Sequence, residues 1–484
     1  MTRSRTEQAQ IDPQLRRRVT GLALAAAVGG FLFGFDSSVI NGAVDAIGEE
    51  FGLGAAVQGF AVAIALLGCA AGAYAAGALA DRLGRLRVML IGAVLFFVSS
   101  IGAGLAFGVL DFMVWRLIGG FGIGVASVIA PTYIAEIVPA AVRGRLASLQ
   151  QLAITLGIFA ALLSDALLAG VGNEDPTREL LFGLPAWRWM FLVGVAPSVV
   201  YGYFALRLPE SPRYLLATGD EDGARAVLRT VQPQAEVDEE VGRILDTIEE
   251  DRENEKKSSL RGPALGLAPV VWVGLALSVF QQFVGINVIF YYSTTLWSAV
   301  GFTDAFLISV ISSVVNVAVT FVAIAIVDRV GRRPMLLAGS IGMAVTLGAM
   351  SIAFSQAQVV ENKLSLPQPW GIVALIAANL FVVSFGATWG PLVWVLLGEI
   401  FPNRIRAKAL GVAAAAQWIA NFLVTVSFPI FSEFSLAFTY GLYAVSSFLS
   451  LLFVFFFVPE TKGVKLEDAG GLVFGRAGKA AVRA

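Results

Sequence analysis

Twelve apolar stretches, each long enough to cross a lipid bilayer, constrain what this chain can fold into. A spanning helix needs roughly 20 apolar residues, and only 14% of the residues are charged, whereas a soluble domain averages about 25%. So little charge cannot cover a soluble surface, and most of the exterior must face lipid. We therefore predict an all-α membrane protein with twelve transmembrane helices. The candidate spans lie at about 19–44, 56–80, 87–108, 111–134, 145–169, 187–207, 267–297, 304–328, 334–356, 369–396, 407–432 and 434–458.

The basic residues between the spans fall mostly on one side of the predicted bundle. Basic loops usually face the cytoplasm, and an even number of spans places both termini on the same side. We therefore expect both termini in the cytoplasm of a cell carrying this protein in its cytoplasmic membrane. The basic side holds Arg82, Arg85, Arg87, Arg143, Arg145, Arg329, Arg332, Arg333, Arg404, Arg406 and Lys408, and the other side holds Arg178, Arg188 and Lys363.

The stretch between the sixth and seventh spans is more polar than its neighbours. Ala224, Val227, Leu228 and Val231 recur at helical spacing among acidic residues, which indicates short amphipathic helices in water. The expected organisation is therefore an N-terminal tail (1–18), a six-helix half (19–207), a helical linker (208–262), a second six-helix half (263–458) and a C-terminal tail (459–484).

Three short motifs occur once in each half, in the same order and on the basic side. Asp-Arg-x-Gly-Arg begins at Asp81 and again at Asp328, and Glu-Ile-x-Pro begins at Glu136 and again at Glu399. The third motif, Pro-Glu-Ser/Thr, follows the last span of each half. A duplicated six-helix unit is typical of transporters that hold their solute near the midplane. We interpret the charged members as a gate that clamps the halves together in one conformation, and simple anchoring at the membrane surface is the alternative. They are Asp81, Arg82, Arg85, Glu136, Arg143, Asp328, Arg329, Arg332, Arg333, Glu399 and Arg406.

Amide side chains and an indole occur at similar depth in several spans. Amides offer both donors and an acceptor, as a sugar hydroxyl requires, and an indole offers a flat face. Formal charge is nearly absent at this depth, which favours a neutral solute. The alternative is that the amides only bond helices to one another. The group comprises Gln151, Gln281, Gln282, Asn316, Gln417 and Trp418, and Gly285, Gly386, Gly390 and Pro391 are expected to interrupt spans seven and ten.

Charged residues inside the spans are few and are functional by default. Asp36 in span one and Arg116 in span four lie at similar depths, so the two side chains can pair. The pair is either a proton switch, in which Asp36 binds a proton and releases Arg116, or a static contact between the spans. Asp165 lies near the outer end of span five, where we expect a residue of a solvated vestibule rather than a second proton carrier.

Composition excludes several functional classes. The chain has no His and only one cysteine, Cys69, so imidazole or thiolate metal sites and Ser-His or Cys-His catalysis are not expected. We expect neither enzymatic activity nor a cofactor, and the net charge of -1 does not favour nucleic acid. A drug–proton antiporter would more often have an open apolar pocket. A transporter-like nutrient sensor would need a longer signalling tail than the residues after Gly463.

Together the motifs resemble the sugar porter family of the major facilitator superfamily. The likeness is carried, along nearly the whole chain, by Arg116–Gly120, Pro209–Arg213, Gln281–Asn287 with Tyr291 and Tyr292, Asp328–Arg333 and Pro459–Gly463. One departure is Leu86, which stands where the first repeat usually has a second Arg.

The resemblance implies residue roles. Positions that contact sugar match Gln151, Gln281, Gln282, Asn287, Asn316, Trp394 and Gln417, and positions that line the pocket match Phe33 and Trp418. Trp394 lies nearer the cytoplasm and can belong to the inner gate instead, while Tyr291 and Tyr292 close the outer side.

The same resemblance implies transport of a sugar, with glucose the first candidate, and proton symport through Asp36, by one chain surrounded by membrane lipid. A second departure bears on coupling, because Gly194 occupies the position of a span-six Glu found in a proton symporter of the family. An uncoupled facilitator therefore remains the alternative.

Overall fold

The computed structural model describes residues 13–257, 260–360, 363–402 and 405–462. Within these residues, twelve helical segments are long and apolar enough to cross a membrane, which confirms the predicted number of spans. The spans are formed by α1 (Pro13–Val39), α3 (Ala55–Leu83), α4 (Arg85–Gly104), α5 (Val109–Ile137), α6 (Ala140–Val171), α7 with α8 (Ala186–Val193, Val195–Arg207), α12 with α13 (Pro269–Phe283, Ile286–Tyr291), α15 (Ala305–Val330), α16 (Arg332–Ser355), α17 with α18 (Trp370–Gly386, Trp389–Ile400), α19 (Arg406–Phe434) and α20 (Leu436–Phe457).

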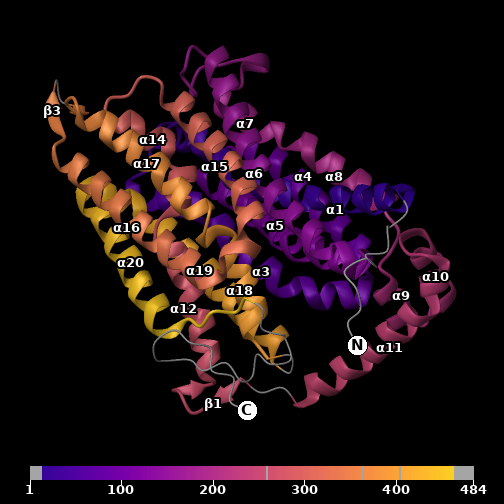
Figure 1. Cartoon of the computed structure of the whole chain (residues 1–484). Helices are drawn as coiled ribbons and strands as arrows, with labels where there is room; N and C mark the ends of the chain where they lie inside the picture. The colour runs from indigo at the N-terminus through magenta and orange to yellow at the C-terminus, as the bar shows by residue number, and fades with distance from the viewer. Residues whose placement is uncertain (1–12, 258–259, 361–362, 403–404, 463–484) are drawn as a thin grey trace.

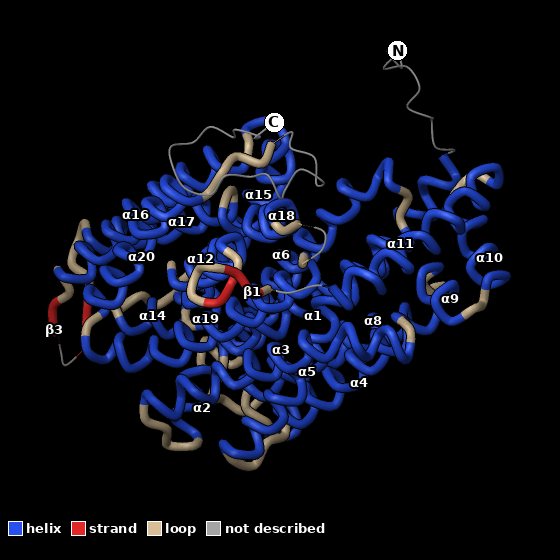
Figure 2. Tube along the Cα trace, turned by 90° about the horizontal axis from the view of Figure 1, so that it is seen from below, coloured by secondary structure: helices blue, strands red, loops and turns tan. Residues whose placement is uncertain are grey.

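The two groups of six spans lie side by side. Figure 1 and Figure 2 both place α1 and α3–α8 on one side of the molecule and α12–α20 on the other. Helices are required here because a backbone in hydrocarbon must satisfy its own polar groups. The two halves touch mainly along α3 with α19 and along α6 with α15.

Helices of the N-terminal half approach one another through glycines. A Cβ on Gly34 of α1 would collide with the backbone of Ile154 in α6, and a Cβ on Gly120 of α5 would collide with the backbone of Ala65 in α3. Small residues at such crossings let two backbones pack directly together. This packing places α1, α3 and α5 around one interior space near Asp36.

Two spans of the C-terminal half are broken, as the glycines predict. Span seven breaks at Gly285, whose φ of 80° favours glycine, and the break lies against the ring of Tyr443. A second break follows Tyr291, and α14 (Ser293–Ala299) continues from there. Span ten breaks between α17 and α18, at Ala387 and Thr388. Each break places the end of one helix and the start of the next within the span.

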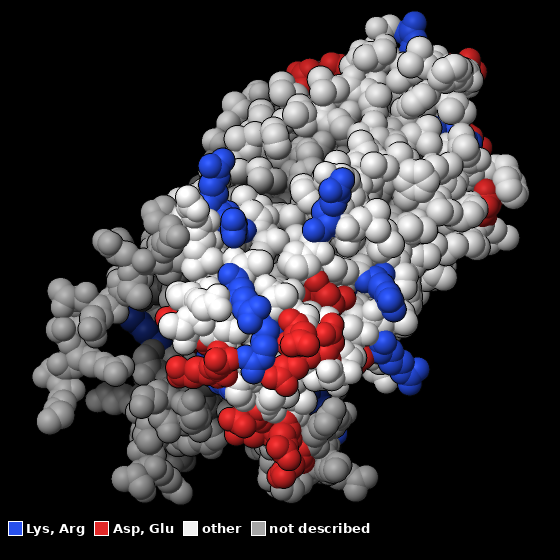
Figure 3. All heavy atoms as spheres, turned by 90° about the vertical axis from the view of Figure 1, so that its right-hand side faces the viewer, with Lys and Arg blue, Asp and Glu red and all other residues white. Residues whose placement is uncertain are grey.

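The short helices that join the halves cover one end of the bundle, which we name the linker face (Figure 1). They are α9 (Pro212–Thr218), α10 (Glu221–Val231) and α11 (Val237–Lys257), with η3 (Gln234–Glu236) and the hairpin β1–β2 (Arg261–Gly262, Gly266–Leu267). Ala224, Leu228 and Val231 are buried, as their spacing predicts. Arg213 of α9 and Asp251 of α11 form an ion pair of 2.6 Å. In Figure 3 charged side chains gather over the lower part of the molecule.

The opposite end of the bundle, named the opposite face, carries the shorter connections. They include η1 (Ile40–Gly42), α2 (Val44–Glu50), η2 (Leu181–Gly183) and the hairpin β3–β4 (Gln358–Val360, Lys363–Ser365). Arg188 donates to Glu50 at 2.5 Å and to the carbonyl oxygens of Gly104 and Ala106. These bonds join α2, α4 and α7 at this face.

Candidate solute site and gates

The break in span seven gathers three amides. Gln281 donates through Nε2 to the carbonyl oxygens of Trp389 and Gly390, at 3.0 and 3.1 Å, where span ten resumes after its own break. Asn287, just past Gly285, donates to Oε1 of Gln282 at 2.6 Å. The Oε1 atom of Gln281 is buried without a protein partner. The amides therefore link both broken spans and leave one acceptor free.

A second group of polar and aromatic side chains comes from α1 and α19. Phe33 and Trp418 meet edge to face, with ring centroids 5.6 Å apart, and so join the two halves. Gln417, next to Trp418, has a buried Oε1 without a protein partner. Buried amide oxygens normally have partners. A ligand hydroxyl can donate to such an oxygen.

Gln151 and Asn316 lie on either side of a contact between α6 and α15. The hydroxyl oxygens of Thr155 and Thr320 are 3.2 Å apart. Thr155 also donates to the carbonyl oxygen of Gln151, and Thr320 donates to the carbonyl oxygen of Asn316, each one helical turn earlier. Because the two helices run in opposite directions, the amides lie about 6 Å to either side of the contact along the helix axes. Trp394 is 44% exposed on α18, outside the contacts that join the other predicted binding residues.

Asp36 and Arg116 form the expected buried pair. Nη1 of Arg116 donates to Oδ1 of Asp36 at 2.5 Å, and the two side chains are 3% and 7% exposed. The guanidinium also stacks over Phe191, 5.6 Å from its centroid. Among these residues lies a cavity of about 10 Å³, about enough for one water molecule. It is lined by Phe33, Asp36, Ser37, Ile40, Val62, Ala65, Leu66, Cys69, Arg116, Ile123 and Tyr291.

The tyrosines of span seven lie between this cavity and the opposite face. Tyr291 lines the cavity, and the hydroxyl of Tyr292 donates to the carbonyl oxygen of Thr425 at 3.0 Å. Beyond them, Thr294 donates to Asn41 through its backbone N–H (3.1 Å) and its hydroxyl (2.5 Å). Thr295 donates to Asp45 at 2.8 Å. These contacts, from Asn41 and Asp45 to Thr294 and Thr295, join the two halves at the opposite face, and we refer to them as the opposite-face gate.

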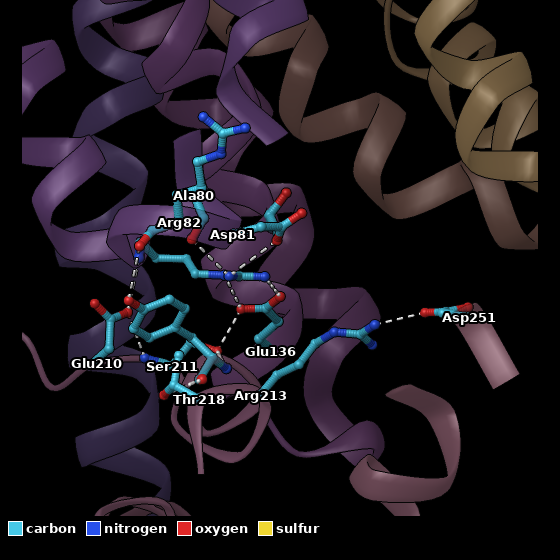
Figure 4. Close-up of polar contacts among 12 residues, drawn as sticks. Ala80, Asp81, Arg82, Glu136, Glu210, Ser211, Arg213, Thr218 and Asp251 are labelled. Atoms are coloured by element: carbon cyan, nitrogen blue, oxygen red, sulfur yellow. Dashed lines mark hydrogen bonds and ion pairs between the residues drawn. The ribbon is translucent and has the colours of Figure 1, made fainter. Parts of the chain in front are cut away.

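At the linker face, the first copy of the repeated motifs forms one network (Figure 4). Arg85 binds Glu136 with two nitrogens, at 2.9 and 2.8 Å, and Ser211 donates to the same carboxylate at 2.5 Å. Glu210 accepts the backbone N–H groups of Arg85 and Leu86 at the start of α4. These bonds tie the starts of α4 and α9 to the end of α5.

The second copy repeats this geometry in the C-terminal half. Arg332 binds Glu399 at 2.9 Å, Thr461 donates to Glu399 at 2.5 Å, and Glu460 accepts the N–H groups of Arg332 and Arg333 at 3.0 and 3.1 Å. The hydrogen bonds and ion pairs given for the two networks each join groups of one copy of the repeat. The sequence interpretation has such groups clamping the halves together in one conformation and releasing them in the other, and this clamp stays a prediction.

The remaining predicted gate residues differ in their surroundings. Asp81 is 3.5 Å from Arg85, and its side chain is 75% exposed. Arg82 accepts a bond from Tyr214 through its carbonyl oxygen, Arg333 donates to the carbonyl of Phe455, and Arg406 donates to that of Phe401. The side chains of Arg143, Asp328 and Arg329 lie outside what the structure describes.

Comparison with known proteins identifies the family. The family model "Sugar (and other) transporter" matches residues 22–471. This chain belongs to the sugar transporter family. The match confirms the predicted transporter class over an enzyme.

Two named sugar transporters cover most of the chain. A glucose transport protein of Synechocystis is 53% identical over 92% of this chain and 95% of its own length. The D-xylose-proton symporter of Escherichia coli K12 is 35% identical over 94% of this chain and 95% of its own length.

Solved structures show the same fold. The proton:xylose symporter bound to 6-bromo-6-deoxy-D-glucose matches with a TM-score of 0.76 at 34% identity, over 94% of this chain and 99% of that one. An inward open structure of the xylose transporter from E. coli matches with a TM-score of 0.77 at 34% identity, over 93% of this chain and 99% of that one. The predicted fold class, two six-helix pseudo-repeats of the major facilitator type, is confirmed.

For this sugar transporter, Gly194 matters as a position where a carboxylate is absent. A Cβ there would lie 2.7 Å from Oγ of Ser100 and 3.0 Å from the carbonyl oxygen of Phe191. A side chain at Gly194 would therefore require Ser100 and the backbone at Phe191 to shift. Nε of Arg116 has no partner.

Sequence reasoning misplaced one residue and missed others. Asp165 was expected in a solvated vestibule, but it is 0% exposed, because η1 and α7 pack over it. Gln150, not singled out, is buried with its amide against Gly30 of α1. Glu210 and Glu460 were recognised as parts of a repeated motif, but no role was assigned to them. Both follow the sixth span of their half, and this shared position was the signal that both make the same contact, with the start of the third span.

Proposed function

We propose that this protein carries glucose together with a proton across the cell membrane by alternating access. The observation that carries the proposal is the pair of buried, unpartnered amide oxygens on Gln281 and Gln417. Hydroxyl groups of a sugar satisfy such acceptors, whereas an apolar solute would leave them unpaired. The glucose transport protein that is 53% identical supports glucose as the sugar.

The linker face is proposed to be cytoplasmic, which places both termini inside the cell. The basic loops between the spans lie at this face, in agreement with the positive-inside tendency. The opposite-face gate then closes the extracellular side, so that the structure represents a state closed to the outside. One chain is proposed to suffice for transport, because both halves of the site come from the same chain.

Asp36 is proposed to carry the proton. When it binds a proton from outside, it loses its charge and its hold on Arg116, and the N-terminal half becomes free to turn against the C-terminal half. The water-sized cavity beside the pair supplies a place for the proton to arrive. Phe33 lines this cavity and also meets Trp418, next to Gln417, so that sugar and proton are proposed to act on the same group of helices.

The available free energy is sufficient for accumulation. A membrane potential of 100 mV supplies about 2.3 kcal/mol per charge. A difference of one pH unit supplies about 1.4 kcal/mol. Their sum corresponds to accumulation of roughly several hundred-fold.

An uncoupled facilitator is the second candidate. The observation that favours it is Gly194, which provides no carboxylate to share the proton with Asp36 and is closely packed against Ser100. In that case the Asp36–Arg116 pair is a static contact between α1 and α5.

The test is uptake of labelled glucose into proteoliposomes with an imposed inward proton gradient and a negative interior. Wild type is expected to accumulate glucose above equilibrium. Asp36→Asn is expected to lose this accumulation and to keep counterflow exchange, because the neutral amide imitates a permanently protonated carboxyl.

A matched control is Glu49→Gln, which neutralises an exposed carboxylate of α2 outside the gate contacts and is expected to retain accumulation. Glucose uptake that only equilibrates in wild type would refute symport and leave the facilitator. Absence of glucose uptake and counterflow in wild type would refute glucose as the solute.

A further inference from the structure

Asp165 is a buried carboxyl that has no role in the proposed proton transport through Asp36. It lies in α6 within a membrane-spanning segment and is 0% exposed. Its Oδ2 accepts the backbone N–H of Gly42 at 3.2 Å, and its Oδ1 is buried without a protein partner. The contact is close, because a Cβ on Gly42 would lie 2.8 Å from both Cβ of Asp165 and Sδ of Met190.

The charged groups on the helices around Asp165 are committed elsewhere. In α1, Asp36 is paired with Arg116 of α5. In α7, Arg188 binds Glu50 of α2 and two carbonyl oxygens. In α2, Asp45 accepts from Thr295, and Glu49 is exposed.

The helices of the C-terminal half bring no charge to this region. The segments 286–299 and 305–326 contain no Asp, Glu, Lys or Arg. Their titratable groups are Tyr291, which lines the cavity by Asp36, and Tyr292, which donates to Thr425. Asp165 therefore faces no cation among the described residues.

Asp165 is connected to the opposite-face gate through two adjacent residues of η1. Gly42 donates its N–H to Asp165, and Asn41, one residue earlier, accepts two hydrogen bonds from Thr294 of the other half. Asn41 and Thr294 are themselves buried, at 1% and 4% exposure. Any change at Asp165 that moves η1 must therefore disturb the contact between the halves.

We propose that Asp165 is a second proton-binding site, which is protonated when the opposite-face gate is closed and releases its proton when the gate opens. An ionised carboxylate that is sealed from water with a single backbone donor is far less stable than its neutral form. Opening the gate withdraws α14 from η1 and admits water, which stabilises the charged form. Protonation and closure are then linked, so that lower pH at the opposite face favours the closed gate.

This inference rests on the alternating access in the proposed function, but not on the identity of the solute or on coupling through Asp36. It gives the carrier a pH-dependent outer gate. Acidification outside the cell would hold the empty carrier closed to that side, and a higher external pH would open it.

The test measures gate opening directly. Spin labels are attached to cysteines at Glu174, in the loop after α6, and at Ser298 on α14, both exposed, in a Cys69→Ala background. Double electron–electron resonance reports the distance between them as the pH is varied, with no sugar and no gradient. The Asp36→Asn variant serves as the starting protein, so that titration of Asp36 makes no contribution.

In this background the ratio of closed to open molecules is expected to fall as pH rises, by up to about tenfold per pH unit, the limit for one proton. Adding Asp165→Asn is expected to abolish this dependence and leave the gate closed. The amide still offers an oxygen to the N–H of Gly42, so the contact with η1 is retained. Persistence of the pH dependence in the double variant, or its absence in Asp36→Asn alone, would overturn the proposal.

Infrared difference spectroscopy provides a second measurement that a purely structural role would not affect. A protonated buried carboxyl has a C=O stretching band that an amide lacks. This band is expected in the closed Asp36→Asn protein and not in the double variant. Identical spectra would show that Asp165 is ionised in the closed state and would refute the assignment. Loss of glucose uptake in a separate assay would bear on the proposed function only.

Discussion

The two halves share a topology but are packed in different ways. In the N-terminal half, a Cβ on Gly34, Gly68 or Gly120 would strike the backbone of a neighbouring helix. In the C-terminal half, a Cβ on Gly285, Gly339 or Gly342 would strike a side chain instead. A side chain can change its rotamer, whereas two packed backbones have no such freedom.

This difference matches the distribution of polar groups. The N-terminal half contains the sealed Asp36–Arg116 pair, and the C-terminal half contains the broken spans and the amides around Gln281. A charge pair inside a membrane needs fixed neighbours, and a solute site needs elements that move. We infer that the N-terminal half is a rigid support and that the C-terminal half adapts around the solute.

Removing the cation of the charge pair is expected to have the largest effect. Arg116→Ala leaves Asp36 buried and unpaired, and loss of one member of a buried pair costs about 3–5 kcal/mol of stability. Thermal unfolding in detergent measures the change. The Asp36→Asn/Arg116→Ala variant should be less destabilised than Arg116→Ala alone, because no charge is then left unpaired. An additive or larger loss in the double variant would contradict this account.

A comparison of glycines tests the rigid and adaptable packing. Gly120→Ala forces apart α3 and α5, and overpacking of this kind costs about 1–3 kcal/mol. Gly342→Ala meets only the side chain of Ser384, with Oγ at 2.5 Å and Cβ at 3.0 Å, and rotation of Ser384 relieves the closer contact. The melting temperature should therefore fall more for Gly120→Ala. Equal losses would remove the distinction between the halves.

Two glutamines with unpartnered oxygens should behave differently. Gln281→Ala removes an acceptor from the solute site, and loss of one hydrogen bond of about 1 kcal/mol weakens glucose binding roughly five- to tenfold. Gln150→Ala, in the N-terminal half, removes an amide that packs on α1 and should lower stability without changing the dissociation constant. Quenching of tryptophan fluorescence by glucose provides the measurement. If only Gln150→Ala weakened glucose binding, the prediction would be wrong, and Gln150 rather than Gln281 would be the residue that binds the solute.

The smallest effect is expected where the halves are most alike. Glu210→Gln and Glu460→Gln each remove the negative charge at the start of a helix, α4 or α16, which is worth about 0.3–1 kcal/mol. Because the bonds have the same geometry, the two losses should agree closely in chemical denaturation. Asp220→Asn, a change at the N-terminus of α10 outside both networks, is the control. A large effect of one variant only would show that the two networks differ in strength.

The number of spans and the Asp36–Arg116 pair could be predicted because both depend on properties that are local along the chain. Apolar length determines whether a segment spans the membrane, and counting residues gives the depth of each charge. The breaks at Gly285 and near Gly386 were similarly visible, since glycine marks positions where a regular helix is least favoured.

The error at Asp165 concerns a contact that depends on tertiary packing. Asp165 lies near the end of its span, but its exposure is decided by η1 and α7, which no local pattern of α6 contains. The repeated motifs at Arg85 and Arg332 showed that both halves possess the same groups without showing where the partners lie. A set of three motifs duplicated as a unit can satisfy itself within one copy, and the structure has this arrangement.

The carboxylates of Glu210 and Glu460 have a consequence for the chain as a whole. Each one lies directly after the last span of its half and binds the start of the third span, so it fastens the end of the six-helix unit back to its interior. Each unit is thereby closed on itself by a residue just beyond its last span. We therefore expect that two polypeptides divided between α11 and α12, expressed together, assemble into one carrier.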